Sequence, residues 1–165
     1  MRGEIYLVIV ILFGMLGYGL IAATYMKKWI TTSPIKHVLQ ILIAVHFFRY
    51  VGLTFILPES ASGEMPAVFS YPAAIGDFLA AVLAVIAFLA LQKESHFAIS
   101  LAWLFNIFGT LDLAYAFSSA ILSEAANLAG GAVWWIPSIY VPALLVSHII
   151  IFQLLIKKPA ELNNI

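Results

Sequence analysis

Five ionisable side chains lie near the middle of long apolar stretches of the sequence. They are Arg49 and His46 in one stretch, Asp77 in the next, Asp112 in the third and His148 in the last. A central Arg or Asp costs roughly 2.5–3.5 kcal/mol to insert into a membrane, so such residues usually face a bundle interior and serve a function. We therefore expect these five side chains to converge.

A metal centre is the first chemistry that this set predicts. Imidazole nitrogens and carboxylate oxygens on facing helices are typical ligands of metals in helical bundles. We expect His46, His148, Asp77 and Asp112 to hold a divalent metal, with Arg49 orienting a carboxylate or an anionic substrate group. Asp77, Asp112 and Arg49 would then be the catalytic groups for redox or hydrolytic chemistry on a membrane-soluble substrate.

Haem b is a variant of the same hypothesis, with His46 and His148 as axial ligands. The two nearby carboxylates argue against haem, because they would repel its propionates. Three further side chains at similar depth are expected to support a cofactor by hydrogen bonding, and they are Tyr50, Asn106 and Tyr115. Tyr50 is included because the α-helical period places it on the face of His46 and Arg49.

Two other classes of function fit the same residues. Buried Asp, Arg and His side chains on neighbouring helices resemble a proton relay, which would make the protein a proton-coupled transporter of an ion or small molecule. The sequence has no inverted repeat, so a transporter of this size would need to form a homo-oligomer. Alternatively, the polar centre orients an apolar ligand, such as a sterol, a quinone or a tetrapyrrole, in a binding or sensory protein.

Composition excludes several classes of protein. The chain has 165 residues, of which 64% are hydrophobic and 10% charged. Soluble domains are nearer half apolar and a quarter charged, so the surrounding solvent must be lipid. There is no Cys, which excludes thiolate chemistry and disulfides. The formal net charge is zero, so nucleic acid is not an expected partner.

The sequence predicts an all-α bundle, in which residues 1–165 form one transmembrane domain. Its apolar stretches each exceed the length of about 20 residues that crosses a bilayer. The five expected spans are Ile5–Tyr25, Ile35–Leu57, Pro72–Gln92, Phe97–Leu122 and Trp135–Ile156. Ser70 and Tyr71 are expected to precede the third span, with Pro72 at its start.

Depth along the helices supports convergence. At 1.5 Å per residue, Arg49, Asp77 and Asp112 all lie about 20–22 Å above the cytoplasmic boundary. His46 and His148 lie about 13–15 Å above it. The sequence therefore predicts two polar layers, one in the outer half of the membrane and one near its midplane.

Basic residues predict the orientation of the chain. One side of the membrane would carry Lys27, Lys28, Lys36, Lys93, Lys157 and Lys158, and the other only Arg2. Cytoplasmic loops are rich in Lys and Arg, so we expect the N-terminus outside and the C-terminus in the cytoplasm of an inner or plasma membrane. The outer loops would carry Glu59, Glu64 and Glu124.

Overall fold

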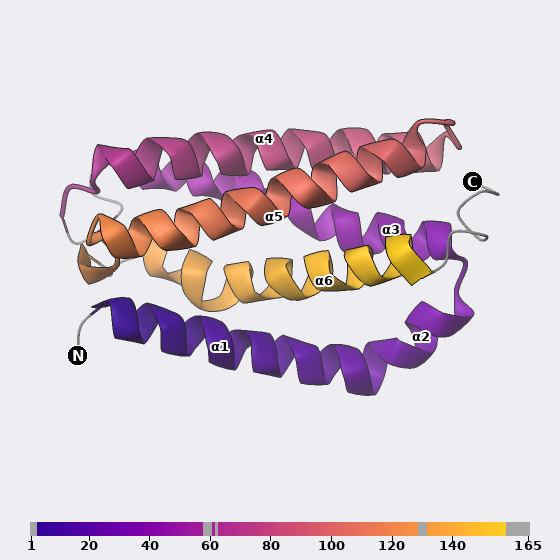
Figure 1. Cartoon of the computed structure of the whole chain (residues 1–165), viewed down its shortest axis with the longest axis horizontal. Helices are drawn as coiled ribbons and strands as arrows, with labels where there is room; N and C mark the ends of the chain where they lie inside the picture. Colours follow the sequence, from indigo (N-terminus) through magenta and orange to yellow (C-terminus); the bar gives the residue numbers. More distant parts are fainter. Residues whose placement is uncertain (1–2, 58–60, 62, 129–131, 158–165) are drawn as a thin grey trace.

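All regular elements in the described part of the chain are helical. The computed structural model describes residues 3–57, 61, 63–128 and 132–157 (Figure 1). Arg2, Glu59 and Lys158, which entered the predicted orientation, lie outside these residues. The elements are α1 (Gly3–Ile21), η1 (Ala22–Met26), α2 (Lys27–Thr32), α3 (Ile35–Ala44), η2 (Val45–Ile56), α4 (Ala67–Gln92), α5 (Ala98–Leu122), η3 (Ala125–Leu128), η4 (Ala132–Trp134), η5 (Ile136–Tyr140) and α6 (Val141–Lys157).

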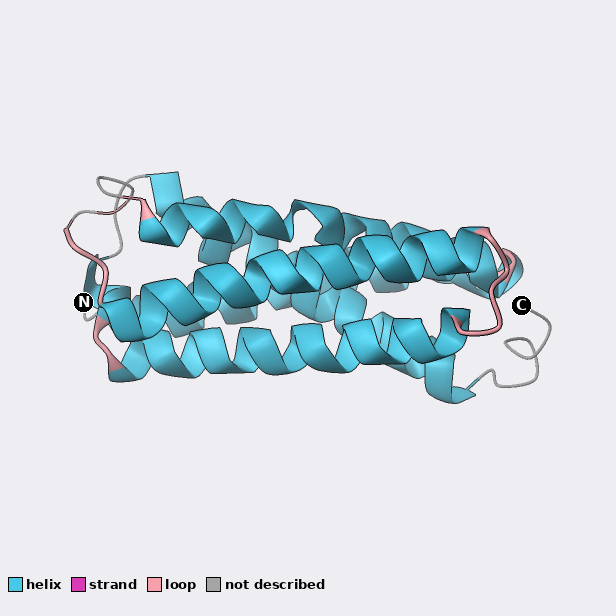
Figure 2. Cartoon of the chain, turned by 90° about the horizontal axis from the view of Figure 1, so that it is seen from above, coloured by secondary structure: helices cyan, strands magenta, loops and turns pink. Residues whose placement is uncertain are grey.

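In the described part of the chain, five helical segments are long and apolar enough to cross a membrane, which confirms the predicted all-α class and the number of candidate spans. They cover Gly3–Thr32, Ile35–Ile56, Ala67–Gln92, Ala98–Leu122 and Ile136–Lys157. Successive segments run in alternating directions along the long axis of the molecule (Figures 1 and 2). Each is therefore positioned to bring its central residues to a common level in the bundle.

Helix α4 makes the most extensive contacts with other helices in the bundle. It packs against η2 on one side and α5 on the other, while α1 packs against α6 and η5. The face of α4 toward its neighbours carries small residues at helical spacing, namely Ala73, Ala80, Ala84 and Ala87, and all four are buried. Small side chains let backbones approach closely, which is a main source of helix association in membranes.

The second span changes its winding in the middle. Residues 35–44 are α-helical, but Val45–Ile56 form a 3₁₀-helix, which has three residues per turn. Its buried residues accordingly recur at every third position, at His46, Arg49, Gly52 and Phe55. This period determines which side chains of the span face the interior.

The predicted start of the third span at Pro72 is wrong. Helix α4 begins at Ala67, because the carbonyl of Pro66 accepts the N–H groups of Phe69 and Ser70, each at 2.9 Å, and nucleates the first turn. Pro72 thus lies inside the helix, where it lacks the N–H that would bond to the carbonyl of Val68. The Tyr115 hydroxyl of α5 donates to that carbonyl at 3.4 Å.

A second proline shapes the start of the last span. Pro142 follows a π-helical turn, η5, in which the N–H of Val141 bonds to the carbonyl of Ile136. The ring of Pro142 lies directly against Gly14 of α1. A Cβ placed on Gly14 would be 2.6 Å from Cγ and 2.7 Å from Cβ of Pro142. A Cβ on Gly17 or Gly19 of the same helix would meet nothing within 4 Å.

We predict that Gly14→Ala lowers the free energy of unfolding by about 1–3 kcal/mol, because the added methyl group overlaps the Pro142 ring. Gly17→Ala is the matched control, since it adds the same methyl group in open space and removes a flexible glycine from the helix. Thermal unfolding in a neutral detergent would measure both. Equal melting temperatures for the two variants would contradict the close contact between α1 and α6.

Candidate functional site

The guanidinium of Arg49 lies at the centre of the bundle and joins three helices. Its Nε donates to Asp77 Oδ1 of α4 at 2.8 Å, and its Nη2 donates to Asp112 Oδ2 of α5 at 2.5 Å. Its Nη1 donates to the carbonyl of Gly109 at 3.2 Å. The Arg49 side chain is fully buried. We refer to Arg49, Asp77 and Asp112 as the Arg49 cluster.

A layer of histidines lies beside the Arg49 cluster. His148 Nε2 is 3.5 Å from Arg49 Nη1, and His148 Nδ1 is 2.6 Å from Asn106 Oδ1. Arginine can only donate, so this geometry assigns a neutral His148 that accepts at Nε2 and donates from Nδ1. The Asn106 amide also donates to the His148 carbonyl at 3.2 Å, which fixes the ring to α5.

His46 packs on this layer without joining its hydrogen bonds. Its ring centroid is 4.2 Å from that of His148 and 4.9 Å from that of Phe105. His46 Nε2 is 2.7 Å from the Ser147 hydroxyl oxygen, and that hydroxyl donates to the carbonyl of Leu144. The imidazole therefore donates to Ser147, and His46 Nδ1 is buried with no hydrogen-bond partner in the described structure.

Glycines make the space that the carboxylates occupy. A Cβ on Gly52 would collide with Asp77 Oδ2, and a Cβ on Gly76 would collide with Asp112 Oδ1. The carboxylate oxygens that do not bind Arg49 thus lie directly against helix backbones. Since no other residue lacks a Cβ, both positions require glycine for the cluster to keep this geometry.

Gly109 makes space in the same way for the side chains of His148 and Arg49. A Cβ there would lie 2.7 Å from His148 Cε1 and 2.9 Å from Arg49 Nη1. Sequence reasoning did not assign these glycines to the site. The signal was present, because Gly52 and Gly109 lie three positions from Arg49 and Asp112 on their own helices.

Six of the eight candidate site residues come together, and two do not. The six are Arg49, Asp77, Asp112, His46, His148 and Asn106. The predicted common face of Tyr50 with Arg49 is wrong, because the 3₁₀ winding turns Tyr50 outward and leaves it 50% exposed. Tyr115 is 47% exposed, and its hydroxyl donates to the Val68 carbonyl rather than to the Arg49 cluster.

The expected four-ligand metal site is not formed. Among the described residues there is no group of three or more His, Cys, Asp or Glu side chains that could hold a metal ion. The reason is Arg49, which occupies the space between the two carboxylates and binds both of them. A haem between the histidines also does not fit this arrangement, because the rings of His46 and His148 touch each other and leave no gap for a macrocycle.

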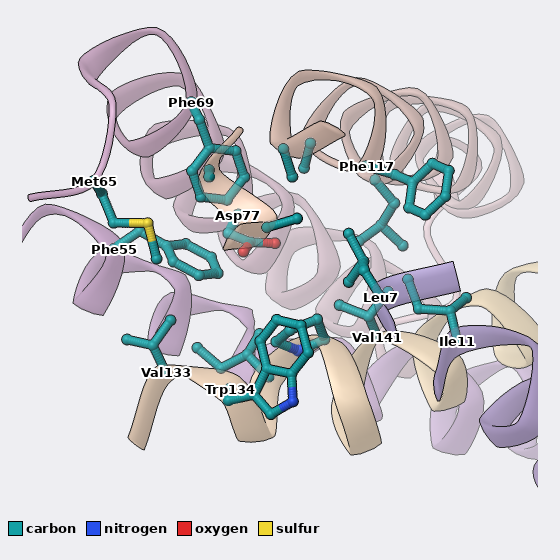
Figure 3. Close-up of a pocket in the computed structure, with 17 residues that line it drawn as sticks. Leu7, Ile11, Phe55, Met65, Phe69, Asp77, Phe117, Val133, Trp134 and Val141 are labelled. Carbon is teal, nitrogen blue, oxygen red and sulfur yellow. The ribbon is translucent and has the colours of Figure 1, made fainter. Parts of the chain in front are cut away.

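A cavity adjoins the Arg49 cluster on the side of Asp77. Its volume is about 70 Å³, and it is only partly enclosed (Figure 3). It lies at the end of the bundle where α1 begins and α5 ends, which we call the cavity end. Its 17 lining residues come from every span and include Leu7, Phe55, Phe69, Ala120, Trp134 and Val141.

Asp77 is the single charged residue among those that line the cavity. Its side chain is 13% exposed, whereas that of Arg49 is fully buried behind it. Figure 3 shows the Asp77 carboxylate amid apolar side chains, with Phe55 and Phe69 beside it. An apolar cavity with one fixed polar group is the usual form of a small-molecule site in proteins, because the apolar walls bind and the polar group orients.

The fold and this site define an all-helical protein with five helices suited to a membrane and a charged cluster buried among them. Residues 6–156 match the family described as Domain of unknown function (DUF8737), so the chain belongs to that family. No curated protein and no solved structure matches the chain. The function must therefore be inferred from the site.

We predict that Arg49→Met lowers the free energy of unfolding by about 3–5 kcal/mol, because it leaves two buried carboxylates without a counter-charge. The matched variant combines Arg49→Met with Asp77→Asn and Asp112→Asn. It should recover at least half of the loss, since no charge then remains in the cluster. Urea unfolding in a neutral detergent would measure all three proteins. A triple variant as unstable as the single one would show that charge is not the cause.

Proposed function

We propose that this protein binds a small lipophilic molecule within the membrane, in the cavity beside the Arg49 cluster. The observation that carries this proposal is the apolar cavity that has the Asp77 carboxylate in its wall. The ligand's apolar part would lie among the side chains from the spans, and its polar group would bind Asp77. The proposal corresponds to the binding or sensory class rather than to the catalytic class.

The size of the cavity limits the ligand. A cavity of about 70 Å³ accommodates a slender apolar group but not a bulky ring system. A chain-like molecule, with its tail extending through the open part of the cavity, therefore suits the site better than a sterol or a tetrapyrrole. Each methylene group removed from water adds about 0.8 kcal/mol to binding, and the carboxylate adds orientation.

A proton relay receives less support from the same geometry. Arg49 stands between the carboxylates and His148, and an arginine does not release its proton in proteins. Beyond the histidines, the described core toward the opposite end is apolar and includes Val38, Leu39, Ile43, Leu91, Ala102 and Ile151. A chain of proton carriers would need polar side chains in that region.

We further propose that the protein lies in the plasma membrane with its N-terminus outside. The described lysines, at positions 27, 28, 36, 93 and 157, lie at the end of the bundle opposite the cavity. Because cytoplasmic ends of membrane proteins are rich in lysine and arginine, this orientation turns the cavity end toward the exterior. The ligand would then enter from the outer leaflet or the outer aqueous phase.

Fluorescence of Trp134, which lines the cavity, would test the binding proposal. The protein would carry Trp29→Phe, Trp103→Phe and Trp135→Phe, so that Trp134 is the only tryptophan and can be excited selectively over the tyrosines. A bromine-terminated undecanol, added to the protein in phosphatidylcholine nanodiscs, should quench the emission saturably. We expect Ala120→Phe, which fills the cavity, to weaken binding about tenfold or more.

Ala114→Phe is the matched control, because Ala114 lies on the same helix but faces outward. It should leave the binding of the brominated probe unchanged. The proposal fails if the probe does not quench Trp134 saturably, or if the variants at positions 120 and 114 have equal effects.

A further inference from the structure

With both carboxylates ionised, the charges of the buried cluster do not balance. Arg49 contributes one positive charge, and Asp77 and Asp112 contribute one negative charge each. His148, the nearest other ionisable group, accepts from Arg49 and so adds no positive charge. An uncompensated charge at this depth is costly, and either a proton on one carboxylate or an added cation would remove that cost.

The position of Asp77 determines where such a cation can bind. Asp77 Oδ1 is taken by Arg49 Nε, while Oδ2 has no hydrogen-bond partner among the described contacts. The oxygen of each aspartate that does not bind Arg49 lies against a glycine, Asp77 Oδ2 against Gly52 and Asp112 Oδ1 against Gly76, but of the two aspartates only Asp77 lines the cavity. A cation in the cavity can therefore approach the cluster at Asp77, whose side chain is 13% exposed.

Among the residues that the structure describes, the charged side chains at the cavity end are acidic, as Asp77 in the wall is. Glu64 and Glu124 directly precede residues that line the cavity, and Glu4 lies three positions before another. No described Lys or Arg forms a salt bridge with any of these three glutamates. At the opposite end, by contrast, Glu94 is paired with Lys36 at 2.6 Å.

Acidic groups from the rim to the interior attract cations and repel anions, because a cleft with charges of one sign concentrates ligands of the opposite sign. The aromatic walls act in the same direction. Phe55 and Phe69 pack edge to face with 5.2 Å between their ring centroids, and both line the cavity with Trp134. The faces of aromatic rings bind quaternary ammonium groups favourably.

From these observations, and resting on the proposed function, we infer that the ligand is a lipophilic cation, with an organic ammonium head held at the Asp77 carboxylate and an apolar tail in the cavity. A neutral alcohol would donate a hydrogen bond to Asp77 but would leave the negative charge of the carboxylate without a counter-charge. A carboxylate of the same length would be repelled by the described glutamates near the rim and by Asp77 in the wall.

Three probes with the same bromine-terminated undecyl chain would test this inference in phosphatidylcholine nanodiscs. They carry a trimethylammonium, a hydroxyl or a carboxylate head, and quenching of Trp134 measures the binding of each. We expect the ammonium to bind about tenfold or more tightly than the alcohol, and the carboxylate to bind least. Dissociation constants are corrected for partitioning of each probe into empty discs.

Two variants assign the preference to the cluster. Asp77→Asn leaves one Arg against one Asp, so the ammonium and the alcohol should bind it within about threefold of each other. Asp112→Asn removes the same charge without changing the cavity wall, and the ammonium preference should fall there as well. Glu64→Gln, at the rim, should slow ammonium association and change its equilibrium binding less than Asp77→Asn does.

The outcomes separate this inference from the proposed function. Equal binding of ammonium and alcohol to the unmodified cluster would overturn the inference, and so would a preference that survives both Asp77→Asn and Asp112→Asn. In those cases alcohol binding still supports the cavity as a site for lipophilic molecules. If none of the three probes binds the unmodified cluster, the proposed function fails, and the inference fails with it.

Discussion

The burial of one guanidinium constrains the whole bundle. Arg49 has no exposed surface, so its donors must find acceptors within the protein, and those acceptors come from α4, α5 and α6. A rotation of any of these helices by one residue would break a charge-assisted hydrogen bond in a medium without water. The cluster thus fixes helix rotation in a membrane, where apolar packing discriminates between rotations only weakly.

Part of this arrangement could be predicted from the sequence. Charges are rare in membrane helices, so the depths of Arg49, Asp77 and Asp112 were sufficient to expect that they converge. The face of Tyr50 could not be predicted, because the hydrophobic pattern gives no warning that the helix tightens at Val45. The cavity was also inaccessible to sequence reasoning, since its wall combines side chains from every span.

The same guanidinium explains why a metal site was predicted where none is formed. Sequence reasoning placed Arg49 behind the carboxylates, as a residue that orients them, but it lies between them and takes the position of the cation. One positive charge then serves two negative ones. Of the two carboxylates only that of Asp77 lines the cavity, which gives an otherwise apolar space a defined polarity.

The tight winding of η2 increases the length that the second span covers. A 3₁₀-helix rises about 2.0 Å per residue, against 1.5 Å for an α-helix. The 22-residue segment Ile35–Ile56 therefore extends about 39 Å, as far as the 26 residues of its neighbour α4. Wound as an α-helix throughout, it would fall short by about 6 Å, roughly one turn. The chain thus crosses the bundle with four fewer residues than its partner and still brings Arg49 level with Asp77 and Asp112.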